Sequence, residues 1–138
     1  MSYLVALLKS LSLILLVVIP YVVYRWSRTN WPTRTGILTG ATLGLVVSPV
    51  SLGLYFLGFL LPLIGMLPAL IGGTLAMFHG APGYELSILL GFQEPGVVVH
   101  GLYALWIQEV LNGVFWSAIY AGVGFFLDKK FLRYAPTT

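Results

Sequence analysis

The stretch GILTGATLGLVVSPVSLGLYFLGFLLPLIGMLPALIGGTLAMF, residues 36–78, decides the fold, because it runs for forty-three residues without a charged side chain. A single helix of that length would be about twice as long as the ~30 Å hydrocarbon layer of a bilayer. The stretch must therefore break, and the glycines and prolines between residues 58 and 68 are typical of helix ends. We expect one helix at about 36–57 and a second at about 63–79.

The composition of the whole chain also indicates that lipid, not water, surrounds most of it. Apolar residues make up 59% of the 138 residues and charged residues only 8%, whereas a soluble domain carries about 25% charged residues. We therefore predict an all-α integral membrane protein that forms a single membrane domain over residues 1–138. The absence of cysteine excludes disulfides and thiolate chemistry. The cations do not alternate with aromatic residues along a groove-sized stretch, so we expect no nucleic-acid partner.

Two further apolar runs flank the central stretch, at about 3–24 and 104–127. Each is long enough to cross a bilayer as a helix, so the sequence predicts four apolar helical segments. Residues 80–100 are rich in proline and glycine and are expected to form an irregular interfacial loop. A short helix at about 84–92 is expected to lie in the interface within this loop.

The cations give two alternative topologies. Four crossings would place Lys9 and the three C-terminal cations on one side, and the three arginines of residues 25–34 on the other. Three crossings, with a re-entrant or short helix at about 58–79, would leave Lys9 alone opposite six cations. The positive-inside rule favours three, but lipid-exposed re-entrant backbone is unfavourable. We expect four crossings, with three as the alternative, in a multi-pass protein of the cytoplasmic (inner) membrane if the source is prokaryotic.

Small residues recur along the second and third segments at spacings that keep them near one helix face. Such faces let two membrane helices approach closely. We interpret them as packing surfaces, either within the chain or toward another subunit, although glycine is also simply common in membrane helices. The predicted packing residues are Gly36, Gly40, Gly44, Ser48, Gly65, Ala69 and Gly73.

Two histidines, His79 and His100, flank the irregular loop. Imidazoles can bind haem, a pigment or a metal. Their separation of twenty-one residues matches no metal motif, so we predict no metal site. We expect two interfacial histidines without a ligand and predict no cofactor, with haem or pigment binding as the alternative.

The last segment carries a second polar candidate, Glu109 with Asn112 on the same helical face. From Val110 to Leu127 a helix would span about 27 Å, nearly the hydrocarbon thickness. Glu109 is therefore expected at the membrane edge, with Asn112 about one turn inside. The alternatives are a buried structural carboxylate or a proton or cation site, since an intramembrane ionisable residue suggests function.

These patterns favour a non-catalytic accessory or scaffolding subunit that packs against other membrane proteins or against itself. The sequence contains no phosphate loop or dinucleotide fingerprint and no evident nucleophile–base pair, so we do not expect an enzyme. One alternative is a small oligomeric transporter or channel that uses Glu109 and Asn112. A second is a lipid-modifying enzyme that uses residues 79–100, through His79, Glu85, Glu94 and His100.

Overall fold

The structure is a computed structural model that describes residues 3–61, 63–96 and 102–134, with backbone only at 102–106 and 131–134. Within these residues every regular element is a helix and none is a strand, which confirms the predicted all-α class. The elements in chain order are α1 (Tyr3–Leu15), α2 (Val18–Asn30), the 3₁₀ turn η1 (Pro32–Arg34), α3 (Thr35–Leu60), α4 (Met66–Leu89) and α5 (Leu102–Tyr134).

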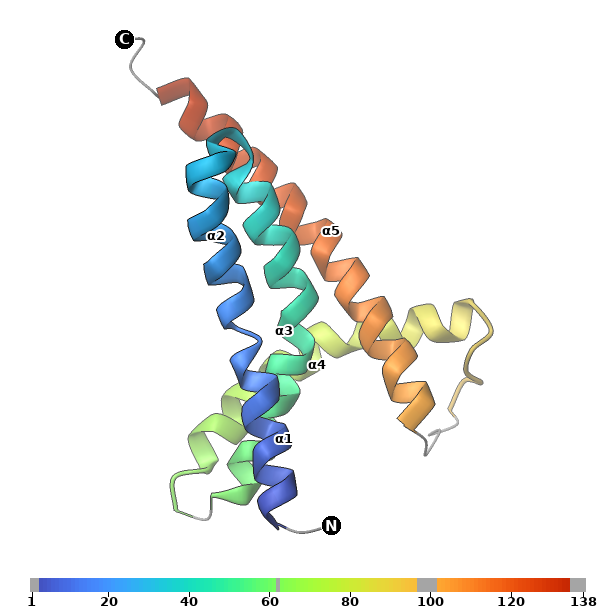
Figure 1. Ribbon diagram of the computed structural model, residues 1–138. Coiled ribbons are helices and arrows are strands. Elements are labelled where there is room, and N and C mark those ends of the chain that lie inside the picture. Colours follow the sequence, from blue (N-terminus) through green and yellow to red (C-terminus); the bar gives the residue numbers. More distant parts are fainter. Residues whose placement is uncertain (1–2, 62, 97–101, 135–138) are drawn as a thin grey trace.

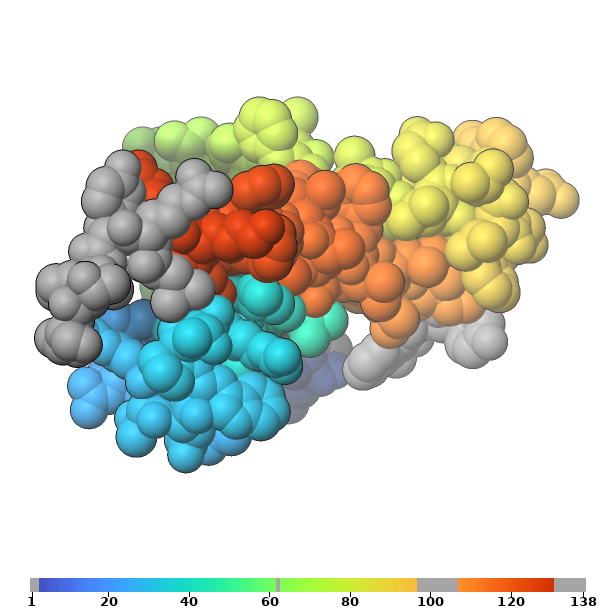
Figure 2. All heavy atoms as spheres, turned by 90° about the horizontal axis from the view of Figure 1, so that it is seen from above, coloured from blue at the N-terminus to red at the C-terminus, as the bar shows by residue number. Residues whose placement is uncertain are grey.

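Helix α3 lies at the centre and contacts each of the other four helices. Figure 1 shows α1 and α2 along one side of α3 and α5 along the other, whereas α4 crosses obliquely behind α3 and α5. Seen from above in Figure 2, α4 and α2 lie on opposite sides of α5. The α2–α3 connection and the C-terminal end of α5 lie together at one end of the molecule, so the bundle presents these two basic segments on the same end.

Helices α1 and α2 follow one another with a short break that Pro20 causes. Proline has no backbone N–H, and its ring crowds the carbonyl four residues earlier, which here belongs to Leu16. Instead, the Leu16 carbonyl accepts a hydrogen bond of 3.0 Å from the Ile19 N–H. Just before it, the Ile14 carbonyl accepts one of 3.1 Å from the Val17 N–H. These three-residue spacings tighten the turn, and the helical stretch then continues beyond the predicted end at residue 24, to Asn30.

The turn between α3 and α4 lies in the region that the sequence predicts. Leu61, which precedes Pro62, has an extended backbone with φ −113° and ψ 92°, because a following proline disfavours the helical conformation. Helix α3 consequently ends at Leu60. Pro68 is the third residue of α4, a position in the first turn where its missing N–H would have no intrahelical partner.

Helix α4 differs from the prediction. We expected a helix end at about residue 79, a loop over 80–100 and a separate short helix at 84–92. These predictions are wrong for residues 80–89, because α4 continues through Pro82 to Leu89. It ends at Leu89, and Gly91, the residue after the C-cap Leu90, adopts the left-handed conformation with φ +76°. Two hydrogen bonds close this end, Gly91 N–H to Ile88 and Phe92 N–H to Ser87, each 2.9 Å, in the arrangement of a Schellman motif.

Three helical stretches are long and apolar enough to cross a membrane, as judged by length and composition within the described residues. They are Tyr3–Asn30, Pro32–Leu60 and Ile107–Lys130. They correspond to the predicted segments at 3–24, 36–57 and 104–127. The fourth predicted segment, 63–79, overlaps the first part of α4, which is not among the three.

Small and polar side chains occupy the interior of the bundle. Among the described residues, Val46, with 7% of its surface exposed, and Pro20 are the buried apolar side chains larger than alanine. Five of the buried positions are serines, and the most fully buried large side chain is Asn112. Large apolar side chains lie on the outside, up to Leu63 at 97% exposure, so the helices associate mainly through small and hydrogen-bonding residues.

Candidate functional site

A ladder of polar side chains on α5 faces α4. Gln108, Asn112, Trp116 and Tyr120 follow one another at intervals of four residues, which places them along one side of the helix. Each makes a hydrogen bond to the stretch that extends from His79 to Gln93. At one end of the ladder, the Gln108 side-chain amide donates a hydrogen bond to the side-chain oxygen of Gln93. This ladder fixes the oblique position of α4 against α5.

Two members of the ladder bind the α4 backbone where Pro82 disturbs it. The Gly83 N–H donates to the side-chain oxygen of Asn112 over 2.5 Å. The Trp116 indole N–H donates to the His79 carbonyl over 3.0 Å. In a regular helix this N–H and this carbonyl would bond to each other. Helix α5 therefore supplies partners at the proline, which explains why α4 continues past the predicted end.

His79 is buried against α5, with 7% of its surface exposed. Its Nε2 lies 2.6 Å from the Tyr120 hydroxyl, its Nδ1 lies 2.9 Å from the Leu75 carbonyl, and its ring packs on Trp116 with the centroids 4.5 Å apart. His79 thus packs inside the bundle, and its place at the membrane interface stays a prediction. Because both ring nitrogens have partners, a haem, pigment or metal could bind only by displacing one of them. His100 lies outside the described residues.

Glu109 lies between α5 and α3. The Ser48 side chain lies beside its carboxylate, while the Glu109 Oε2 atom is buried without a hydrogen-bond partner among the described residues. Ser48 is the fourteenth of the twenty-six residues of α3, so Glu109 lies opposite the middle of that helix. Glu109 is also the third residue of the candidate membrane span Ile107–Lys130, so its place at the membrane edge stays a prediction.

The small residues predicted for packing lie at contacts within this chain. A Cβ atom added at Gly36, Gly40 or Gly44 would overlap the backbone of α5, and one at Gly65 would overlap the end of α3. Ala69 contacts Gly58, and Gly73 faces the Tyr55 ring, with 3.3 Å between its hypothetical Cβ and that ring. The structure thus places the α3 face against α5 and the α4 face against α3.

Asp128 has a role that its position after an apolar run does not suggest. Its Oδ1 accepts a hydrogen bond of 2.8 Å from the Gly36 N–H, and its Oδ2 accepts one of 3.0 Å from the Ile37 N–H. These amides belong to the first turn of α3, where backbone N–H groups lack intrahelical partners. A carboxylate from α5 therefore caps α3, whereas the sequence suggests only the exit of the last helix into water.

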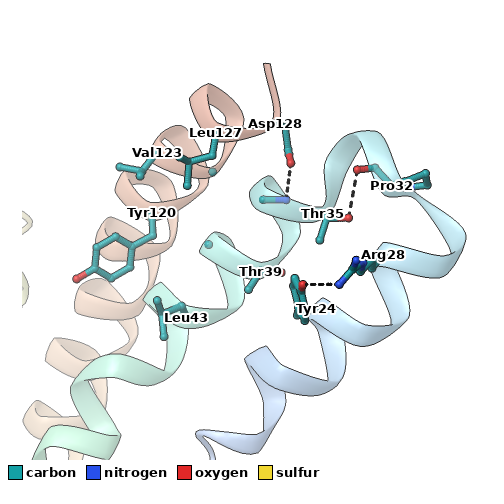
Figure 3. Close-up of a pocket in the computed structure, with 13 residues that line it drawn as sticks. Tyr24, Arg28, Pro32, Thr35, Thr39, Leu43, Tyr120, Val123, Leu127 and Asp128 are labelled. Carbon is teal, nitrogen blue, oxygen red and sulfur yellow. Dashed lines mark hydrogen bonds between the residues drawn. The ribbon is translucent and has the colours of Figure 1, made fainter. Parts of the chain in front are cut away.

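A groove of about 630 Å³ lies beside this cap, between α2, α3 and α5. Figure 3 shows its lining: Tyr24 and Arg28 from α2, Thr39 and Leu43 from α3, and Val123 and Leu127 from α5. The Arg28 guanidinium donates a hydrogen bond of 3.0 Å to the Tyr24 hydroxyl at the rim. Arg28 and Asp128 thus give a polar end to a cavity whose walls are otherwise largely apolar.

The described members of the set considered for lipid chemistry do not form one cluster. His79 faces inward, whereas Glu85 and Glu94 are exposed. Within the described part of the chain, no three His, Asp or Glu side chains are close enough to hold a metal ion. Comparison with protein-family models, curated proteins and solved structures gives no match, so the chemistry of this chain is inferred from its own contacts.

Proposed function

We propose that the chain is a non-catalytic accessory subunit of a membrane complex, and that its outer α4 face binds another membrane protein. The outer α4 face comprises Met66, Leu67, Leu70, Met77 and Phe78. Their side chains are between 65% and 86% exposed. This exposed apolar face on a helix that is not among the three stretches able to span a membrane carries the proposal.

The position of α4 is the reason for expecting a protein partner rather than lipid alone. A regular transmembrane helix satisfies its backbone within itself, whereas an oblique helix that contains a proline needs protein around it at membrane depth. On the inner side of α4, Asn112 and Trp116 supply this cover. The outer side carries two methionines and a phenylalanine, residues that suit adaptable protein contacts.

We further propose three membrane crossings rather than four. In this arrangement the loop over residues 25–34 and the C-terminal end of α5 share one side, as they share one end in Figure 1. Six of the seven cations then lie on that side, with Lys9 on the other. The positive-inside rule assigns this end to the cytoplasm. The end that holds the α3–α4 turn faces the opposite compartment.

Site-specific photo-cross-linking in the native membrane tests the subunit proposal. A photoreactive amino acid at Phe78, which is 70% exposed on α4, should give one discrete cross-linked product. The same group at Phe126, 71% exposed on α5, is the matched control and should give mainly lipid adducts. Mild-detergent purification should then recover the cross-linked partner with this chain in a fixed stoichiometry.

The opposite results would overturn the proposal. A stable monomer that leaves the native membrane without a stoichiometric partner would contradict a subunit role. Equal cross-linking from Phe78 and Phe126 would show that α4 offers no particular docking surface.

A second candidate function, transport of a proton or small cation, is favoured by one observation. The buried Glu109 Oε2 has no hydrogen-bond partner among the described residues, and a carboxylate within a membrane helix is often an ion site. Purified protein in liposomes would then dissipate an imposed proton or cation gradient, and Glu109→Gln would abolish this flux without changing the far-UV circular dichroism. Flux equal to that of empty liposomes would eliminate this candidate.

A further inference from the structure

The groove between α2, α3 and α5 combines apolar walls with a cationic rim. Its volume of about 630 Å³ is within the range of pockets that bind small ligands. It extends along α3 from Thr35 to Leu43, a rise of roughly 12 Å. A ligand matched to this shape is elongated, with a polar group at one end.

The rim favours an anionic group. Arg28 is exposed, and its side-chain hydrogen bond within the described residues goes to the neutral Tyr24 hydroxyl. Both oxygens of Asp128, the acidic residue at the rim, are already bound by the amides that begin α3. The cations of the α2–α3 connection and of Lys129 and Lys130 lie at the same end and add positive potential.

The walls favour an acyl chain below that group. Leu43, Val123 and Leu127 line the groove and are 42%, 53% and 48% exposed. The floor is formed where the glycines of α3 meet the α5 backbone, at Gly40 and Gly124 among others. Helical backbone and aliphatic side chains offer few free hydrogen-bonding groups, so the lower groove suits hydrocarbon. The exception is Thr39, which lines the groove and whose Oγ1 is buried without a partner among the described residues.

We propose that the groove binds one phospholipid with an anionic headgroup. Arg28 holds the phosphate through charge-assisted hydrogen bonds, and one acyl chain lies along α3 between Leu43 and Val123. The bound lipid joins α2 to the α3–α5 pair at the end where Asp128 caps α3. This inference does not depend on the proposed subunit role, because the groove is lined by α2, α3 and α5 and not by α4.

Native mass spectrometry of the purified chain, titrated with phosphatidylglycerol or phosphatidylcholine of the same acyl composition, tests the proposal. We expect one tightly bound phosphatidylglycerol and about tenfold weaker binding of phosphatidylcholine, because the choline ammonium neutralises the phosphate charge and is repelled by the cations at this end. Arg28→Gln should remove this preference. Arg25→Gln is the matched control, because Arg25 is an exposed arginine on the same helix that does not line the groove.

Variants of the walls separate a lipid site from a simple phosphate site. Leu43→Trp and, from the opposite wall, Val123→Trp should fill the groove and weaken binding of both lipids. Glycerol phosphate should not displace phosphatidylglycerol at equal concentration. Equal affinity for the two lipids, an equal effect of Arg25→Gln and Arg28→Gln, unchanged binding in both tryptophan variants, or displacement by glycerol phosphate would each overturn the proposal.

Discussion

The side-chain oxygen of Asn112 in α5 accepts a hydrogen bond from the backbone N–H of Gly83 in α4, over 2.5 Å. The residue before Gly83 is Pro82, so this bond lies where the α4 backbone is disturbed. Asn112 is only 1% exposed, and its amide therefore completes a neighbouring helix rather than facing lipid or solvent. The bond links a helix that can span a membrane to one that is not among the spanning stretches.

Asn112→Leu should destabilise the chain by about 1–2 kcal/mol, because a side chain of similar size leaves the buried Gly83 N–H without its partner. The measurement is the free energy of unfolding in mixed detergent micelles. Thr74→Val is the control, since the Thr74 hydroxyl is exposed and bonds only to the Leu70 carbonyl of its own helix. Equal stability of the two variants would show that the Asn112 bond contributes nothing beyond a local one.

Much of the fold follows from the sequence, because apolar runs and helix breakers act locally. Pro62 ends α3 as expected, since a proline restricts the residue before it whatever lies around. Pro82 is the instructive exception. Sequence alone predicts a helix end there, but Asn112 and Trp116, about thirty residues later, bind the groups that the proline disturbs. A break that another helix repairs is not visible in a local pattern.

Gly40→Ala should lower the free energy of unfolding in detergent by about 1–3 kcal/mol. Its added methyl would overlap the Tyr120 carbonyl, so α3 and α5 would have to move apart. Gly122→Ala is the matched control on α5, because nothing lies within 4 Å of its hypothetical Cβ. There the change should be neutral or stabilising, as alanine favours helix by about 1 kcal/mol over glycine. If both variants unfold alike, close approach at Gly40 is not what limits the packing.

The candidate site is less predictable than the fold, because depth and partners depend on how the helices cross. Counting residues back from Asp128 places Glu109 near the start of its segment. The candidate span Ile107–Lys130 agrees with that count. The neighbour of the carboxylate, Ser48 in the middle of α3, follows only from how α5 packs on α3. Asp128 directly follows the apolar run in the sequence, which by itself gives the residue no partner. Its capping of Gly36 requires two segments ninety-two residues apart to meet.

Asp128→Ala should fray the start of α3, because the Gly36 and Ile37 amides lose their acceptor. Removing a capping side chain costs about 1–2 kcal/mol, and the negative charge at a helix N-terminus adds a further favourable term. The specific readout is hydrogen exchange, which should accelerate at these two amides. Glu85→Ala, which removes an exposed carboxylate from α4, should leave their exchange rates unchanged. Unchanged exchange in Asp128→Ala would refute the capping role.

Single cysteines test the number of crossings, and the chain contains none of its own. The exposed positions Asn30, Glu94 and Lys130 are suitable for labelling with a membrane-impermeant maleimide in sealed vesicles. With three crossings, Asn30→Cys and Lys130→Cys should react from the same side, and Glu94→Cys from the other. With four crossings, Asn30→Cys and Glu94→Cys should react together, with Lys130→Cys on the opposite side. The pairing of Asn30 with Glu94 would therefore refute the three-crossing arrangement, because α4 would then have to traverse the bilayer despite its oblique course across α3 and α5.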